Sequence, residues 1–457
     1  MPTNPQAYRP AAALLTLGDR FYDPVAAADF PETRLRFRND RAASQVGLET
    51  LDDGEWTRAF GRFVPLPDTL PGPLALRYHG HQFRHYNPDL GDGRGFTFAQ
   101  MRDGAGRLLD LGTKGSGTTP WSRAGDGRLT LKGGVREVLA SEMLEALGVP
   151  TSRSLSLIET GEALVRGDEP SPTRSAVLVR MSHGHIRIGS FQRLAYLRDA
   201  DGMAALVAYT LRELYGEEPG GEQAADAARL LDRVVGRTAT LAASYMAAGF
   251  VHGVLNSDNI NVTGESFDYG PWRFAQTWDP DFTAAYFDHQ GLYAFGRQPE
   301  AIHWDAMQLA VSLRLLADSA PLIAALDTFA DRYQAAVSAA ILWRLGVRPR
   351  DADSDRALVQ ATEKALRTTG TGIDRFFHDA FGGGLPHRYG PEWDNVRTLL
   401  TAYDPRSDRT HPHWRGEPCA MSIDTVEAIW AAIDERDDWS PFAAKIDAIR
   451  AMGAALR

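Results

Sequence analysis

The chain has 457 residues, 44% of them hydrophobic and 24% charged, which are the proportions of an ordinary folded protein with room for more than one domain. The net charge of −10 argues against a nucleic-acid partner or an anionic membrane surface, and no apolar run approaches the roughly 20 residues of a membrane span. The single cysteine, Cys419, excludes an internal disulfide, and with no secretory leader at the N-terminus it predicts a cytoplasmic protein.

Residues 1–75 are Pro-rich and mixed in character, and we expect them to wrap around the domain that follows. The next three histidines, His79, His81 and His85, lie close enough in sequence to suggest a metal site. Their spacing matches no zinc pattern, however, and no cysteine completes a ligand set. We therefore expect these side chains to form local hydrogen bonds.

A glycine-punctuated turn, Gly91-Asp92-Gly93-Arg94, leads into an alternating strand predicted over residues 96–101. Glycine lets a backbone approach a phosphate closely, and an arginine can donate two parallel hydrogen bonds to it. A plain hairpin turn uses the same residue types. The turn alone therefore does not decide between a phosphate site and a structural turn.

The next strand, predicted over residues 108–113, ends on Lys114 and a glycine-rich loop. Apolar residues at helical spacing then predict a helix over residues 133–147, with Glu137 in its first turn. In protein kinases a strand lysine contacts the ATP phosphates and pairs with a helix glutamate, in this order along the chain. A solvated lysine at a strand end is the alternative interpretation.

Two arginines follow the next pair of strands. We expect a hairpin over residues 155–165, turning around Gly161, and a strand over residues 176–179. Arg180 and Arg187 bracket the polar loop after that strand, and together they could grip a polyphosphate. Two unrelated surface arginines would give the same pattern.

From about residue 200 the pattern becomes helical. Apolar stripes predict helices over residues 203–214, 227–245, 304–317 and 322–345, followed by further helices and a glycine-rich break at 382–384. A strand-rich half before a helix-rich half is the layout of an α+β, bilobal protein-kinase-like fold. We expect four regions: an N-terminal wrapping segment (1–75), a nucleotide-binding N-lobe (76–190), a helical C-lobe (191–345) and a divergent helical C-terminal region (346–457).

The stretch from residue 250 to 270, FVHGVLNSDNINVTGESFDYG, has the spacing of a kinase catalytic loop followed by its metal-binding loop. Kinases carry H-R-D-x-x-x-x-N and then D-F-G, where the first Asp orients the hydroxyl nucleophile and the Asn and second Asp hold metal ions. Here Asn259 and Asp268 stand at the two metal positions, but Val254 replaces the catalytic Asp. A carboxylate remains one residue before the Asn, at Asp258.

On the residues alone, two interpretations of this stretch stay open. Asn and Asp bond their own backbone in turns, so Asn256, Asp258 and Asn259 could be turn residues between strands. Alternatively, the chain has a kinase fold in which catalysis has been lost or has moved to another carboxylate.

With these pieces in order, the sequence resembles the selenoprotein O (SelO) family of kinase-like protein adenylyltransferases. The resemblance rests on long blocks in fixed order: YHGHQFRHYNPDLGDGR (78–94), LGTKGSGTTPWSRAGDGR (111–128), VREVLASEMLEALGVPTSRSLSL (135–157), HIRIGSF (185–191), HGVLNSDNINVTGESFDYGP (252–271) and FDHQGLYAFGRQP (287–299). These blocks cover most of residues 76–300. The N-terminal segment matches more loosely, and the end of the chain matches poorly.

The resemblance implies that ATP binds flipped relative to ordinary kinases, so that AMP passes to Ser, Thr or Tyr hydroxyls of protein substrates and pyrophosphate is released. It implies ATP as co-substrate, with UTP as an alternative donor, and Mg²⁺ as cofactor, with Mn²⁺ as an alternative. By matching positions it assigns these roles: Asp258 as proton acceptor; Asn259 and Asp268 as metal ligands; Lys114 and Glu137 as the ion pair; and Gly91, Gly93, Arg94, Asp126, Gly127, Arg180 and Arg187, together with Asp268, as the nucleotide site.

Two rival functions use the same residues differently. A γ-phosphoryl-transferring protein kinase would use Asp258 in place of the missing loop Asp and would release ADP. A non-catalytic pseudokinase scaffold would bind nucleotide and tolerate Asp258→Ala, although such a module has no need of both metal ligands. The sequence identifies neither the protein substrates nor an oligomeric state.

Overall fold

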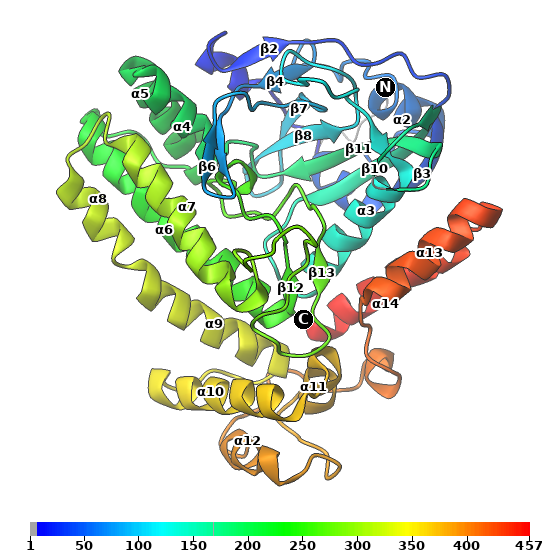
Figure 1. Ribbon diagram of the computed structural model, residues 1–457, viewed down its shortest axis with the longest axis vertical. Helices are drawn as coiled ribbons and strands as arrows, with labels where there is room; N and C mark the ends of the chain where they lie inside the picture. The colour runs from blue at the N-terminus through cyan, green and yellow to red at the C-terminus, as the bar shows by residue number, and fades with distance from the viewer. Residues whose placement is uncertain (1–6, 168) are drawn as a thin grey trace.

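The computed structural model describes residues 7–167 and 169–457, so the first six residues of the predicted wrapping segment lie outside the described residues. The chain forms a strand-rich part up to Ser182 and a helix-rich part from Ile188 onward (Figure 1). None of the described helices is long and apolar enough to cross a membrane. The architecture is therefore mixed α/β, with an antiparallel sheet before a helical C-terminal region.

One antiparallel sheet dominates the N-terminal part. In the described residues it has nine strands: β1 (Pro10–Ala11), β2 (Tyr22–Pro24), β3 (Arg34–Arg38), β4 (Leu74–Leu76), β7 (Thr97–Arg102), β8 (Leu108–Lys114), β9 (Leu129–Thr130), β10 (Arg153–Leu164) and β11 (Thr173–Ser182). They run in the order β2-β4-β7-β8-β11-β10-β3, with β1 paired to β7 and β9 paired to β11. Two short ribbons lie outside this sheet: β5 (Gly80–Gln82) with β6 (His85–Asn87), and β12 (Phe250–Val251) with β13 (Arg273–Phe274).

Both faces of the sheet are covered, because successive strand residues point to opposite sides. On β11, Val177 shares a buried apolar cluster with helix α2 (Asp53–Phe60) of the N-terminal segment. Its neighbour Leu178 belongs to the cluster that contains helix α3 (Leu131–Ala146). The sheet is therefore held between α2 and α3, and α3 carries Glu137.

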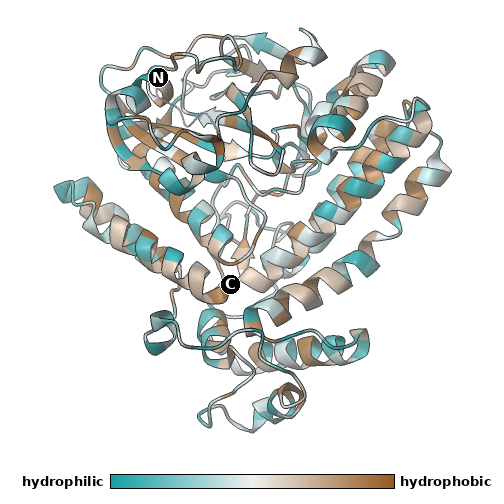
Figure 2. Cartoon of the chain, turned by 180° about the vertical axis from the view of Figure 1, so that it is seen from behind, coloured by the Kyte–Doolittle hydropathy of each residue, from teal (hydrophilic) through white to brown (hydrophobic). Residues whose placement is uncertain are grey.

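The helix-rich part is built around α6 (Gln223–Ala248), the longest of the described helices. The remaining helices are α1 (Asp40–Ala43), which belongs to the N-terminal segment, and α4 (Ile188–Leu197), α5 (Ala200–Tyr209), α7 (Gln298–Leu313), α8 (Ser319–Leu326), α9 (Phe329–Leu345), α10 (Ala352–Thr369), α11 (Ile373–Ala380), α12 (Asp394–Leu400), α13 (Ile423–Arg436) and α14 (Ser440–Leu456). Hydrophilic and hydrophobic residues alternate along the long helices in Figure 2, as expected for helices that bury one side.

The predicted hairpin over residues 155–165 is wrong. β10 continues through this stretch as one strand, and its register shifts around Gly161, which has φ +76°. The shifted segment stays attached to β11, because the Thr160 hydroxyl lies 2.5 Å from the Ser175 hydroxyl and the Glu162 N–H donates to the same oxygen at 3.0 Å. A glycine that looked like a hairpin turn therefore marks a β-bulge.

The single helix predicted over residues 322–345 is also wrong, because α8 ends at Leu326 and α9 begins at Phe329. The Thr328 hydroxyl donates to the Ala325 carbonyl at 2.7 Å. Such a local side-chain bond competes with the helical pattern.

The predicted local hydrogen bond is confirmed for His79, whereas His81 bonds a residue 111 positions further along the chain. The Nδ1 atom of His79 lies 2.7 Å from the Tyr86 hydroxyl, and the Nδ1 atom of His81 lies 2.7 Å from the Gln192 amide nitrogen. The second bond holds the β5–β6 ribbon against α4.

Candidate active site

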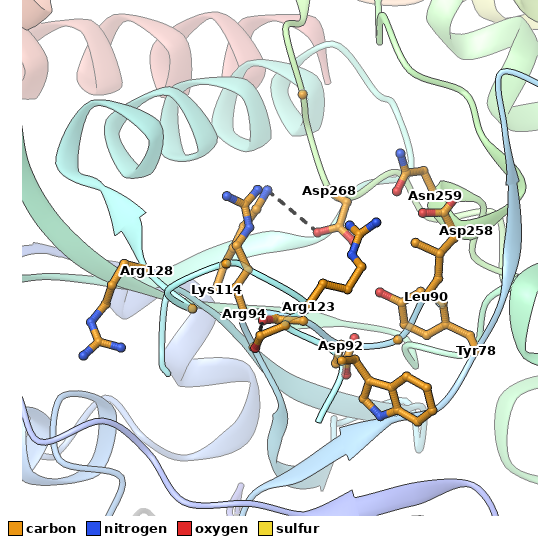
Figure 3. Close-up of a pocket in the computed structure, with 18 of the residues that line it drawn as sticks. Tyr78, Leu90, Asp92, Arg94, Lys114, Arg123, Arg128, Asp258, Asn259 and Asp268 are labelled. Atoms are coloured by element: carbon orange, nitrogen blue, oxygen red, sulfur yellow. Dashed lines mark hydrogen bonds and ion pairs between the residues drawn. The ribbon is translucent and has the colours of Figure 1, made fainter. Parts of the chain in front are cut away.

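A pocket of about 790 Å³ opens between the sheet and the loops after α6, a volume typical of small-molecule sites (Figure 3). Eleven of the twelve residues that the sequence singled out line it: Gly91, Gly93, Arg94, Lys114, Asp126, Gly127, Arg180, Arg187, Asp258, Asn259 and Asp268. The twelfth, Glu137, lies behind Lys114 and holds it. Residues from five separate stretches of the chain therefore meet at one place.

The strand lysine and the helix glutamate form a buried pair. The Lys114 ammonium donates to Glu137 Oε1, and it lies 3.8 Å from Asp268 Oδ1, which it faces in Figure 3. Burial lowers the pKa of Lys114, and the neighbouring Glu137 carboxylate opposes that shift. The alternative interpretation of Lys114 as a solvated lysine is therefore wrong. Its ammonium group is buried at the pocket wall and held in a fixed orientation.

Cations surround Asp268. Arg180 donates to its Oδ1, and Arg187 donates to its Oδ2 at 2.5 Å. Burial would raise the pKa of this carboxyl, but Arg180, Arg187 and Lys114 hold it well below its usual range. Both arginines are buried, at 5% and 3% exposure, so the interpretation of them as surface residues is wrong.

Asp92 supports Arg187, a contact that the sequence reasoning missed. The Arg187 Nη2 atom lies 3.3 Å from Asp92 Oδ1, and the other oxygen of Asp92 accepts the Leu76 N–H at 3.0 Å. The rings of Tyr78 and Phe267 lie 4.5 and 4.6 Å from the Arg187 guanidinium carbon. The aspartate between the two glycines was visible in the sequence, but nothing there marked its distant partner.

Two further arginines, Arg94 and Arg123, line the pocket with exposed side chains. No acid in the described part of the chain lies within ion-pair distance of either guanidinium. With Lys114 and the buried arginines, they give the pocket an excess of positive charge that suits a polyphosphate.

The glycines of the site make room for protein as well as for a ligand. A Cβ at Gly91 would stand 2.3 Å from the Trp121 ring, and one at Gly93 would stand 2.9 Å from the Trp121 carbonyl oxygen. Gly127 has φ +69°, and a Cβ there would stand 2.2 Å from the Gly117 carbonyl. Gly91 and Gly93 therefore let the loop after β8 fold back onto the 91–95 turn, and Gly127 lets that loop close on itself.

We predict that Gly127→Ala lowers the free energy of unfolding by about 1–3 kcal/mol, because it combines a left-handed backbone with a clash against Gly117. Urea denaturation measures this change. The matched control is Gly104→Ala, where no atom lies within 4 Å of the new Cβ and φ is not positive. The control should stay within about 0.5 kcal/mol of the wild type. Equal stability of the two variants would contradict the packing described for this loop.

The segment that leads to Asp258 is anchored by the two residues before it, Asn256 and Ser257. The Asn256 side-chain oxygen accepts the Phe83 N–H at 3.0 Å and the Tyr293 hydroxyl at 2.7 Å. The Ser257 hydroxyl accepts the His81 N–H at 2.7 Å. Asn256 is therefore a structural anchor that joins distant segments, and its side chain does not bond its own backbone as the turn interpretation expected.

Asp258 and Asn259 follow on a 3₁₀ turn, Ser257–Asn259, and line the pocket. Asn259 donates through its amide nitrogen to the Val254 carbonyl at 3.1 Å, which leaves its amide oxygen available as a ligand. Asp258 Oδ1 is buried and has no hydrogen-bond partner among the described residues, and burial raises the pKa of Asp258 to about 6. A carboxylate with a free oxygen and a pKa near neutrality is suited to accept a proton.

The donor set also fits a magnesium ion. The Asn259 amide and the Asp268 carboxylate offer oxygen ligands on one pocket wall, which is the ligand type that Mg²⁺ prefers. The part of the chain that the structure describes contains no group of three or more His, Cys, Asp or Glu side chains that could hold a metal. Two oxygen ligands would leave most of the coordination of such an ion to water and other oxygen ligands.

Comparison with known proteins agrees with the resemblance seen in the sequence. A family model described as "Protein adenylyltransferase SelO" matches residues 5–401. The chain is also similar to proteins named "Protein nucleotidyltransferase YdiU". The one from Gloeobacter violaceus is 46% identical over 466 residues, covering 95% of this chain and 93% of the relative. The one from Synechococcus elongatus is 50% identical over 393 residues, covering 84% and 77%. The one from a Synechocystis species is 43% identical over 477 residues, covering 96% and 98%. The similarity thus extends well beyond residues 76–300.

Proposed function

The chain belongs to the SelO family of protein adenylyltransferases, and from that premise we propose that it transfers AMP from ATP to Ser, Thr or Tyr hydroxyls of protein substrates and releases pyrophosphate. The observation that carries this proposal is one pocket in which Lys114, Arg180 and Arg187 surround Asp268 and which Asp258 also lines, with a buried Oδ1 that has no hydrogen-bond partner among the described residues.

The proposal includes a bilobal kinase-like arrangement and a cytoplasmic location. The N-lobe would span residues 76–190 and the C-lobe residues 191–345, with flanking segments 1–75 and 346–457. An antiparallel sheet with a Glu-bearing helix on one face, followed by helices and a nucleotide-sized pocket, supports this division.

In the proposed reaction the outer phosphates of ATP bind Arg180 and Arg187, so that the α-phosphate faces the acceptor hydroxyl. Asp258 takes the hydroxyl proton while the new oxygen–phosphorus bond forms and the bond to pyrophosphate breaks. Val254, at the position of the kinase Asp, has no group that accepts a proton. The fixed cations position the phosphates and neutralise their charge, which are the main requirements of nucleotidyl transfer.

Asn259 and Asp268 would hold Mg²⁺, with Mn²⁺ as the alternative. Such an ion supplies charge neutralisation at the phosphate oxygens when it is bound. Arg180 and Arg187 both donate hydrogen bonds to Asp268 in this structure. The ATP phosphates would therefore compete with the Asp268 carboxylate for the same guanidinium groups. UTP in place of ATP is a variant that leaves these roles unchanged.

Product analysis separates this function from its rivals. We expect the purified protein, with Mg²⁺, ATP and a mixture of unrelated soluble proteins as acceptors, to release one pyrophosphate for each AMP bound to protein. Lys114→Met serves as the inactive control, and intact-protein mass spectrometry identifies the adduct. ADP with phosphorylated protein would establish the kinase instead. Nucleotide binding without either product would favour the scaffold.

A further inference from the structure

The C-terminal helices α13 and α14 fold back toward α3, the helix that carries Glu137 (Figure 1). They lie beyond residue 401, where the match to the family model ends. α14 approaches the end of α3 very closely: a Cβ at Gly453 would stand 3.1 Å from the Ala146 Cβ and 3.2 Å from its Cα. Contact this close means that the position of α14 depends on that of α3, and the reverse.

Glu142 of α3 is the polar link between the two helices. Its side chain is only 2% exposed, and Arg450 of α14 donates to both of its oxygens, at 2.8 and 2.9 Å. Asn39 and Arg41 add bonds of 3.0 and 3.2 Å to the same carboxylate. A bidentate arginine–carboxylate pair has a fixed geometry, so it sets the separation and the rotation of the two helices.

α14 is itself anchored at both ends. Asp437, just before the helix, pairs with Arg174 of β11 at 2.7 Å. At the other end Arg406 donates to the Leu456 carbonyl at 2.5 Å, and its own N–H donates to the Gly346 carbonyl, just after α9, at 2.7 Å. α14 is therefore a strut that runs from the sheet to the helix-rich part and touches α3 on the way.

We propose that Arg450 is a positioning residue of the nucleotide site: through Glu142 it fixes α3, and thereby keeps Glu137 on Lys114. Glu142 follows Glu137 by five residues and so points about 140° away around the helix. One side of α3 thus faces the pocket lysine while another side is held by the strut. Arg450 touches neither nucleotide nor substrate, and this inference rests on the proposed function of the pocket.

The test compares the full-length wild type with Arg450→Met, which keeps an unbranched, flexible stem but removes the guanidinium group. We expect the affinity for a non-hydrolysable ATP analogue, measured by calorimetry, to fall about five- to tenfold and KM for ATP to rise by a similar factor. Arg450→Lys, which keeps the positive charge on a single donor nitrogen but not the bidentate geometry, should give an intermediate value. The matched control is Arg436→Met at the end of α13, whose side chain is 62% exposed, and it should stay within about twofold.

A double-mutant cycle separates positioning from a general loss of stability. In a Glu137→Gln background, Arg450→Met should change analogue affinity by less than about twofold, because the link to Lys114 is already broken. An equal loss in both backgrounds, or unchanged affinity in Arg450→Met itself, would overturn the inference. Glu142→Gln removes the same link from the other side and should weaken binding in the same way, so the conclusion does not depend on one variant's folding. Analogue binding without AMP transfer by the wild type would contradict the proposed function alone.

Discussion

Asp268→Asn is expected to lower the rate of AMP transfer by at least about 10³-fold, because it removes a proposed metal ligand at the point where phosphate charge develops. The same change should strengthen ATP binding in the absence of metal, by about three- to tenfold. This opposite effect follows from the geometry: both oxygens of Asp268 accept hydrogen bonds from Arg180 and Arg187, the groups proposed to bind the outer phosphates. Without the carboxylate charge, phosphate no longer competes for them.

The substitution should also destabilise the nucleotide-free protein by about 3 kcal/mol, because the buried Arg180 loses its carboxylate partner and the buried Arg187 keeps only Asp92. Thermal unfolding with and without ATP measures this effect, and ATP should raise the melting temperature more in the variant than in the wild type. Asp281→Asn, an exposed residue of the loop that follows, is the control and should behave as wild type. Unchanged transfer by Asp268→Asn, or weaker metal-free ATP binding, would refute this assignment.

Asp258→Asn is expected to lower kcat by about 10²- to 10⁴-fold, the usual contribution of a general base. The exchange keeps the size of the side chain, and Asp258 Oδ1 has no hydrogen-bond partner among the described residues that the variant would lose. ATP affinity should therefore change by less than about twofold, and the protein should be at least as stable, because a buried charge is removed. Steady-state kinetics and calorimetry on the same preparation separate the two quantities.

This result would discriminate between enzyme and scaffold. A scaffold that only binds nucleotide would keep its function in Asp258→Asn. A variant that retains transfer to within tenfold of the wild type would require another proton acceptor, and Asp258 would then have a structural role.

The parts of the site that could be predicted from sequence are those in which one residue type sits at a fixed distance from another along the chain. Lys114 ends β8 and Glu137 lies on the next helix, as the strand and helix patterns indicated. Asn259 and Asp268 were found from their spacing to His252. In each case the spacing along the chain is enough to identify the residues, because the motif lies on one or two consecutive elements.

Contacts between distant segments could not be predicted in this way. Arg180 meets a carboxylate 88 residues further along the chain, and Arg450 meets one 308 residues before it. Each of these residues, seen alone, is typical of a solvated surface. Only the folded chain shows that they are paired, and the strut on α3 could not have been inferred without it.

The residue type alone also gave an incomplete expectation for several glycines, because a glycine can be required for more than one reason. Gly161 carried the signal of a hairpin turn but forms a bulge within β10. Gly91 and Gly93, which the resemblance assigns to the nucleotide site, line the pocket and also lie against Trp121. The residue type was informative in both cases, but the partner that required it lay elsewhere in the sequence.

The measurement that tests the central claim most directly uses two ATP samples, one labelled on the α-phosphate and one on the γ-phosphate. Wild type and Asp268→Ala are incubated with each sample and Mg²⁺, and the label bound to protein is counted. The account predicts protein-bound label from the α position only, and its loss in the variant. Label transferred from the γ position would contradict the flipped nucleotide and identify the protein as a kinase.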